Sequence, residues 1–213
     1  MAATSRPDRR SQATRRADSR ALILDAAVEL LVERGYAGTT TVAIQERAGV
    51  TRGRLLHHFP SRDALLVAAA QHLADERLLE MERWFVRTED PAPAGGRRLD
   101  RAIAELWTTF RQPYFWAAME LWTAARTDDD LRSELAGAER RLGRAINDVV
   151  ATMFGPVHSS HPAFDDVREL LFTSMRGVAL TYSFVVRDAD LDPHLAMWRS
   201  ITRQLLGLPS DAE

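Results

Sequence analysis

Apolar residues recur along most of the chain at spacings of three and four, the period of an α-helix with one buried face. In the first such stripe Leu24, Val28 and Leu31 lie about one turn apart, and Gly35 follows as a helix end. The pattern predicts an all-α protein of about nine helices. Their expected ranges are roughly 18–35, 41–48, 52–58, 61–85, 97–112, 113–127, 128–154, 164–186 and 192–206.

Two of these helices are short and separated by a tight turn. Gly49 ends the helix over 41–48 because glycine readily takes the left-handed conformation that follows a helix. The hydroxyl of Thr51 is placed to cap a second helix, 52–58, which ends before Pro60. This spacing predicts a helix-turn-helix motif over residues 40–59. Its second helix suits insertion into the DNA major groove, where guanidinium groups reach guanine edges or phosphates.

The same segment carries a family resemblance. Residues 48–65, AGVTRGRLLHHFPSRDAL, closely resemble the recognition region of TetR-type transcriptional regulators, A-G-V-S/T-x-G-x-L/I-Y-x-H/Y-F-x-S/T-K-E/D-x-L. The resemblance extends over about residues 19–70. Two positions depart from it: Leu56 replaces a tyrosine that donates to phosphate, and Arg62 replaces a lysine, which keeps the charge but changes its geometry.

The motif and the resemblance together give a set of candidate DNA-binding residues. Arg52 and Arg54 are expected at or near base edges, Thr51 and Arg62 at the DNA backbone, and the histidines near phosphate. Gly53 allows a close approach of the helix to DNA. The full set is Thr41, Thr51, Arg52, Gly53, Arg54, Leu56, His57, His58 and Arg62.

Large aromatic residues gather in the middle of the chain, where four of the five tryptophans lie between positions 84 and 122. Such residues together with methionine favour a roomy apolar cavity, although each one alone also fits a packed core. The resemblance implies an effector pocket, and Glu120 suits a cationic ligand, an exposed position on its helix or an internal partner such as Arg126. The candidate pocket residues are Trp107, Phe110, Phe115, Trp116, Met119, Glu120, Trp122, Met175 and Tyr182.

The last two helices each present an apolar stripe that needs a covering surface. By resemblance, they pair with the same helices of a second subunit in a four-helix bundle, and a homodimer then presents two recognition helices to a palindromic operator. The alternative is burial within one chain. The candidate interface residues are Val167, Leu171, Val178, Leu195, Trp198, Ile201 and Leu205.

Charge is distributed unevenly over a chain whose net charge is −2. Residues 1–62 hold 11 Arg and 6 acidic residues, whereas the remainder holds 17 Arg and 24 acidic residues. A basic head on an acidic body is typical of a DNA-binding end joined to a regulatory part. We therefore expect a disordered basic arm over 1–17, a DNA-binding domain over 18–77 and a domain for effector binding and dimerisation over 78–213.

Other functions find little support in the sequence. The chain has no cysteine, no run of about 18 uncharged apolar residues and no signal-peptide pattern, so we expect a cytoplasmic protein without a membrane partner. It contains no nucleophile elbow, P-loop or dinucleotide fingerprint, and we expect neither an enzyme nor a cofactor. Asp128, Asp129 and Asp130 fit a helix cap, and His158 and His161 fit a loop, so no metal site is predicted.

The expected function is therefore a ligand-responsive transcriptional regulator. It would act as a repressor that a small apolar or amphipathic effector releases from DNA, because the effector favours a state in which the two recognition helices no longer match successive major grooves. A ligand-blind DNA-binding or partner-interaction protein of the same fold is the alternative.

Overall fold

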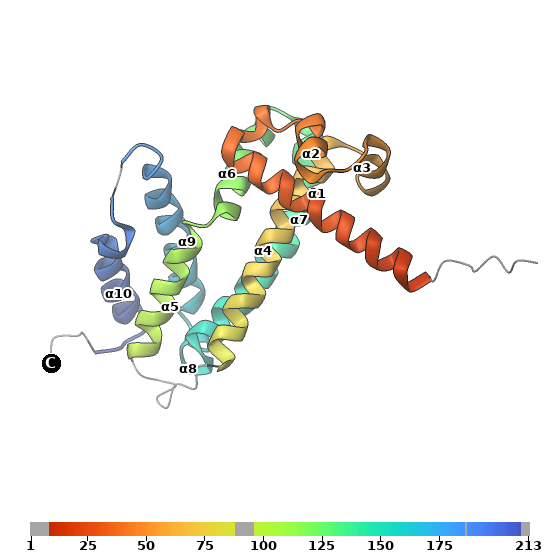
Figure 1. Ribbon diagram of the computed structural model, residues 1–213. Helices are drawn as coiled ribbons and strands as arrows, with labels where there is room; N and C mark the ends of the chain where they lie inside the picture. Colours follow the sequence, from red (N-terminus) through yellow and green to blue (C-terminus); the bar gives the residue numbers. More distant parts are fainter. Residues whose placement is uncertain (1–8, 88–95, 186, 210–213) are drawn as a thin grey trace, which may run out of the picture. The chain divides into compact units, whose positions relative to one another are not determined.

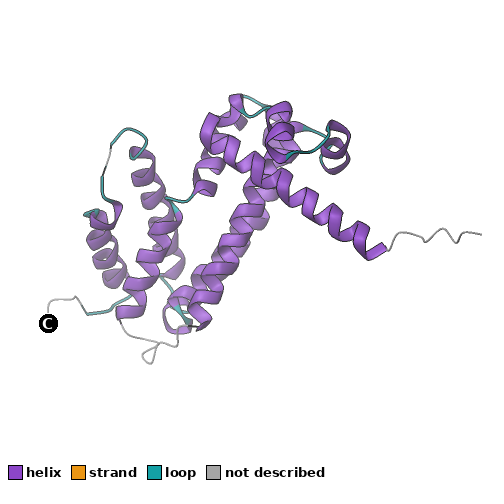
Figure 2. Ribbon diagram, viewed as in Figure 1, coloured by secondary structure: helices purple, strands orange, loops and turns teal. Residues whose placement is uncertain are grey.

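The computed structural model describes residues 9–87, 96–185 and 187–209, and these form ten α-helices and one short 3-10 helix, with no strand among them (Figures 1 and 2). The all-α prediction is therefore confirmed. The helices are α1 (Arg9–Gly38), α2 (Thr41–Ala48), α3 (Arg52–His58), α4 (Arg62–Arg87), α5 (Gly96–Thr109), α6 (Pro113–Ala125), α7 (Asp129–Phe154), α8 (Pro156–Ser159), α9 (Phe164–Thr181) and α10 (His194–Leu205), with the 3-10 helix at Ala189–Leu191.

Helix α1 begins at Arg9, nine residues before the expected start at Asp18, so part of the predicted disordered arm is helical. Residues 1–8 of that arm lie outside the described part of the chain. Near the other end of α1, Gly35 has φ 67° and ψ 179° and interrupts the helix, as its expected role requires.

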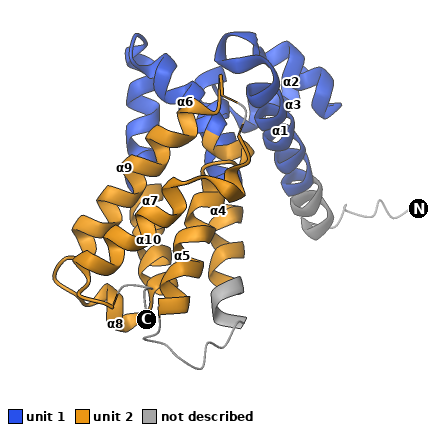
Figure 3. Ribbon diagram, turned by 90° about the vertical axis from the view of Figure 1, so that its left-hand side faces the viewer, with its two compact units in different colours: residues 1–74, 116–140 blue, residues 75–115, 141–213 orange. Residues whose placement is uncertain are grey.

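The chain divides into two compact units (Figure 3). Unit 1 contains residues 1–74 and 116–140, and unit 2 contains residues 75–115 and 141–213. The first division lies close to the expected boundary after residue 77. Residues 116–140, which the sequence analysis assigned to the C-terminal domain, instead share the core of unit 1, because Leu121, Leu131 and Leu135 are buried in the same cluster as Leu24 and Leu55.

Unit 2 is built around α5, α9 and α10, with α10 packed against both of the others (Figure 1). Helix α9 ends at Thr181, five residues before the expected end, and a turn follows. Trp107 on α5 and Trp198 on α10 are the largest fully buried side chains of this unit. None of the described helices is long and apolar enough to span a bilayer.

Candidate DNA-binding site and effector cleft

Local capping contacts define the two short helices of the motif. The hydroxyl oxygen of Thr40 accepts the Ala43 N–H at the start of α2 at 3.2 Å, and Thr51 does the same for the Arg54 N–H in α3 at 3.3 Å. Between them Gly49 has φ 63°, and its N–H donates to the carbonyls that end α2. The predicted bounds of both helices, the Gly49 turn and the Thr51 cap are thus present, whereas the Thr40 cap was not anticipated.

The outward side of α3 carries most of the predicted DNA-binding residues. Leu55 is buried and anchors the helix, whereas the candidates Arg52, Gly53, Arg54, Leu56 and His57 are exposed. Neither Arg52 nor Arg54 has an ion pair among the described residues, so two guanidinium groups remain available to an anionic partner. Thr41 is half-buried at the start of α2.

The surroundings of His58 show that this positive region continues onto α1. Burial lowers the pKa of His58, and the neighbouring positive charges of His57, Arg16, Arg20 and Arg54 lower it further. Arg20 lies over the ring of Phe59, with its guanidinium carbon 5.4 Å from the ring centroid. Arg16 and Arg20 were not among the predicted DNA-binding residues, although the excess of arginine before residue 62 indicated basic residues in this region.

Arg62, which was expected at the DNA backbone, has internal partners in the structure. Its Nε donates to the Thr39 carbonyl at 2.7 Å, a second nitrogen donates to the Tyr36 carbonyl, and the guanidinium lies 4.2 Å from the centroid of the Tyr36 ring. The Tyr36 hydroxyl in turn donates to Asp63 at 2.8 Å. The hydrogen bonds of Arg62 therefore link the start of α4 to the segment between the end of α1 and the start of α2.

Glu120, a candidate pocket residue, lies at the same connection. Its Oε2 accepts the N–H of Tyr36 at 2.8 Å, directly after the break in α1. A Cβ at Gly35 would lie 2.8 Å from that oxygen, a contact that a shift of the flexible Glu120 side chain relieves, so the positive φ is the reason for glycine at this position. Trp116, Met119 and Trp122 also belong to unit 1 and are half-buried.

The other five candidate pocket residues belong to unit 2 and form part of its packed core. Trp107, Phe110, Phe115 and Met175 are all buried, and the Trp107 ring centroid lies 5.9 Å from that of Tyr182. The Tyr182 hydroxyl donates to Asp192, and burial followed by this bond raises the pKa of Tyr182 to about 12. The nine predicted residues are therefore divided between two compact units.

The predicted interface residues also separate into two groups. Val167, Leu171 and Trp198 are fully buried within the chain, and the Trp198 indole N–H donates to the Ser174 hydroxyl at 2.9 Å. Val178, Leu195 and Ile201 are half-buried, and Leu205 is exposed. Leu180, Met197 and Leu205 give α9 and α10 an exposed apolar surface.

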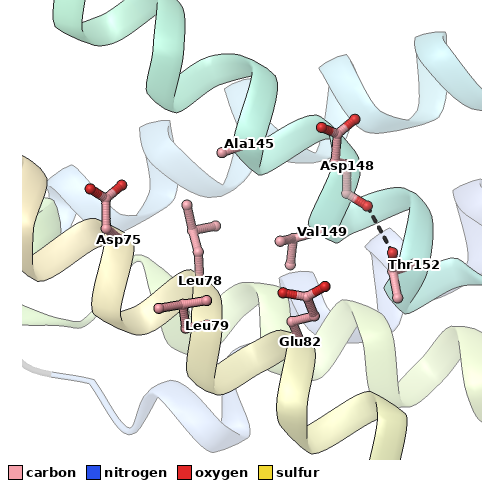
Figure 4. Close-up of a pocket in the computed structure, with 8 residues that line it drawn as sticks. All are labelled: Asp75, Leu78, Leu79, Glu82, Ala145, Asp148, Val149 and Thr152. Atoms are coloured by element: carbon pink, nitrogen blue, oxygen red, sulfur yellow. Dashed lines mark hydrogen bonds between the residues drawn. The ribbon is translucent and has the colours of Figure 1, made fainter.

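Unit 2 contains a cleft of about 420 Å³, which was not predicted from the sequence (Figure 4). Each of two helices contributes four residues at spacings of three, four and seven. They are Asp75, Leu78, Leu79 and Glu82 on α4, and Ala145, Asp148, Val149 and Thr152 on α7. The lining thus combines an apolar surface with three carboxylates that have no ion pair among the described residues. None of the predicted pocket residues lines it.

Comparison with known proteins identifies relatives among bacterial regulators. A sequence model described as "Bacterial regulatory proteins, tetR family" matches residues 23–69. The HTH-type transcriptional repressor Rv3405c of Mycobacterium tuberculosis is 37% identical over 142 residues, which span 63% of this chain and 76% of that protein. The HTH-type transcriptional regulator CymR of Pseudomonas putida is 29% identical over 174 residues, covering 82% of this chain and 84% of CymR.

Solved structures show the same fold. GusR of Salmonella enterica superposes with a TM-score of 0.62 at 21% identity, over 89% of this chain and 95% of that one. A transcriptional regulator from Saccharomonospora viridis in complex with choline gives a TM-score of 0.61 at 16% identity, over 90% and 96% of the two chains. The arrangement of the helices is therefore shared with proteins of low sequence identity.

Proposed function

The chain belongs to the TetR family of bacterial regulatory proteins, and on that premise we propose that it is a ligand-responsive repressor that binds a palindromic operator as a homodimer. Its class is a DNA-binding transcriptional regulator, and its relatives are not enzymes. The observation that carries the proposal is the outward side of α3, where Arg52 and Arg54 are exposed and have no ion pair among the described residues.

Sequence reading is assigned to α3. Arg52 and Arg54 contact base edges or nearby phosphates, and His57 and His58 lie near the phosphates of the same groove. Arg62 acts as a positioning residue, since its guanidinium holds the carbonyls of Tyr36 and Thr39. The test is selection of bound fragments from random duplex DNA at near-physiological salt. We expect one palindrome with half-sites separated by one or more helical turns, and no enrichment would contradict the proposal.

Homodimer formation is assigned to the exposed apolar surface of α9 and α10. Leu180, Met197 and Leu205 are each about 40% exposed, and apolar side chains of this kind are stabilised by burial against a second subunit. Leu205→Glu should shift the protein to monomer in sedimentation velocity. Val157→Glu, at an exposed apolar position on α8, is the control and should leave the dimer intact. A Leu205→Glu protein that remains dimeric would contradict this assignment.

The effector is assigned to the cleft between α4 and α7, and its proposed chemistry is an amphipathic organic cation. The volume of about 420 Å³ is typical of small-molecule sites. The carboxylates of Asp75, Glu82 and Asp148 favour a positive group, and Leu78 and Val149 favour an apolar body. The core aromatics are less suited because their rings pack against one another, as Phe110 and Phe115 do at 5.4 Å. Choline in the Saccharomonospora viridis protein is an organic cation bound by a protein of the same fold.

A thermal-stability screen with choline and longer alkyl quaternary ammonium compounds tests this assignment, because a ligand that binds the native state raises its melting temperature. A true effector should also weaken operator binding. Glu82→Gln with Asp148→Asn should reduce the thermal shift, whereas Glu169→Gln on α9 is the control. The absence of any response across apolar and cationic compounds would favour the ligand-blind alternative.

A further inference from the structure

We infer that Leu56 is a specificity-determining residue, which reads a thymine through the 5-methyl group of the base. The inference rests on the proposed function, because it requires that α3 lies in the major groove. Leu56 is 49% exposed, whereas its neighbour Leu55 is 2% exposed and anchors the helix. Much of the surface of Leu56 therefore remains available to a partner of the protein.

The position of Leu56 on α3 brings it to the same surface as the basic residues. Residues three and four apart lie next to each other on a helix, so Leu56 is adjacent to Gly53 and to Arg52. Arg52 is available to a phosphate or a base edge, and contact there would bring Leu56 against the DNA as well. A Cβ added at Gly53 would meet no atom within 4 Å, so the glycine leaves this part of the helix surface open for close approach.

The chemistry of leucine selects the part of the DNA that it contacts. Leucine has no donor for a phosphate, and pressing it against a phosphate would remove water from the anion without returning a hydrogen bond. The major groove presents one apolar group, the C5-methyl of thymine, and apolar side chains recognise it by contact. Leu56 thus replaces the backbone contact of the family tyrosine with a contact that depends on the base.

The test compares thymine with uracil in the selected operator. Deoxyuridine keeps the Watson–Crick edge of thymidine and lacks the methyl group, so single replacements isolate the contact. At one thymine position in each half-site, we expect the replacement to weaken binding of the wild-type protein about fourfold, the factor that corresponds to one buried CH₂. The Leu56→Ala variant should bind the two operators equally at that position.

Three further variants make the result specific to the side chain. Leu56→Met keeps an apolar group of similar volume and should retain the preference for thymine. Leu56→Tyr restores the family residue and should lose the preference while keeping affinity for the operator. Leu22→Ala removes a leucine of similar exposure from α1 and is the control, because it should leave the thymine-to-uracil ratio unchanged.

The outcomes separate the inference from the proposed function. A wild-type protein that selects an operator but tolerates uracil at every position would overturn the role of Leu56 and leave the proposed function standing. Equal sensitivity to uracil in wild type and Leu56→Ala would have the same meaning. A protein that selects no operator would overturn both. Thermal unfolding of Leu56→Ala and Leu22→Ala establishes that both variants are folded before their affinities are compared.

Discussion

The cores of the two units differ in the kind of residue that fills them. Unit 1 is packed mainly with leucine, isoleucine, valine and alanine, and Phe59 is the one aromatic among the described buried residues of that cluster. In unit 2 the buried residues include Trp107 and Trp198, whose ring centroids are 5.0 Å apart, and Phe154 and Phe164, at 5.4 Å. Small aliphatic residues allow short helices to pack closely, whereas large rings bury more area per residue.

This difference shows where the aromatic residues of unit 2 lie, which is within its packed core. The aromatic rings of unit 2 pack against one another. The Trp107 indole N–H donates to the Ala189 carbonyl at 2.8 Å. The cleft in the same unit is lined instead by aliphatic and acidic residues of α4 and α7. In unit 1 the side chains proposed to contact DNA lie outside the core, so that core supports the recognition helix without forming the site.

The largest expected effect is the loss of an aromatic anchor in unit 2. Trp198→Ala removes a fully buried indole and its hydrogen bond to Ser174, and we expect the free energy of unfolding to fall by about 3–5 kcal/mol. Chemical denaturation measures the change. Trp198→Phe keeps a ring and loses the N–H, so its cost should be smaller. A loss below about 1 kcal/mol for Trp198→Ala would contradict the central role of the rings.

The second prediction concerns the turn at Gly49 that connects α2 and α3. In Gly49→Ala the new Cβ would meet no atom within 4 Å, yet the residue has φ 63°. The left-handed conformation alone should therefore cost about 1–2 kcal/mol of stability, measured by thermal unfolding. Gly53→Ala is the matched control, because its Cβ also has open space and its backbone is helical. Equal stability of the two variants would show that the turn relaxes without cost.

The features that the sequence predicted correctly are those that depend on residues close together in the chain. The bounds of α2 and α3 and the cap at Thr51 depend on residues within four positions of each other, and all were correctly predicted. The pairing of α4 with α7 in the cleft joins residues about seventy positions apart. Nothing in the local pattern specifies that pairing, although the acidic and apolar residues at one-turn spacing on each helix were visible.

Other differences have equally specific causes. For Glu120 the sequence left an internal partner open, and the structure supplies one in the Tyr36 N–H, 84 positions away rather than in the nearby Arg126. Helix α9 stops at Thr181, and the Tyr182 hydroxyl then binds Asp192. Burial alone would raise the pKa of Asp192, but hydrogen bonds from Tyr182 and His194 outweigh it and hold that pKa below its usual value. Such contacts depend on tertiary packing rather than on helical period.

A smaller effect separates stability from DNA binding in unit 1. Gly53→Ala replaces a poor helix former with a good one in open space, so we expect stability to rise by up to about 1 kcal/mol. The same methyl group would hold α3 away from the DNA, so operator affinity should fall. Gly143→Ala on α7 also adds a Cβ in open space, and it should raise stability without changing affinity. If Gly53→Ala bound the operator as tightly as wild type, close approach at this residue would be excluded.

The smallest effect concerns the pH dependence of unit 2. Burial lowers the pKa of His158, and the charges of Arg98 and His161 lower it further, so the folded protein disfavours the protonated ring. The unfolded chain takes up this proton near pH 6.5, its usual value. Stability from His158 is therefore complete above about pH 6.5 and decreases as the pH falls toward the lower folded pKa. His158→Gln should reduce the slope of unfolding free energy against pH between about pH 7 and 5, measured by denaturation of the DNA-free protein.

His58 also has a lowered pKa, so some of this pH dependence should remain in the variant. His57→Gln on the exposed side of α3 controls for the loss of one histidine, and an unchanged slope in His158→Gln would remove the proposed role of this buried ring.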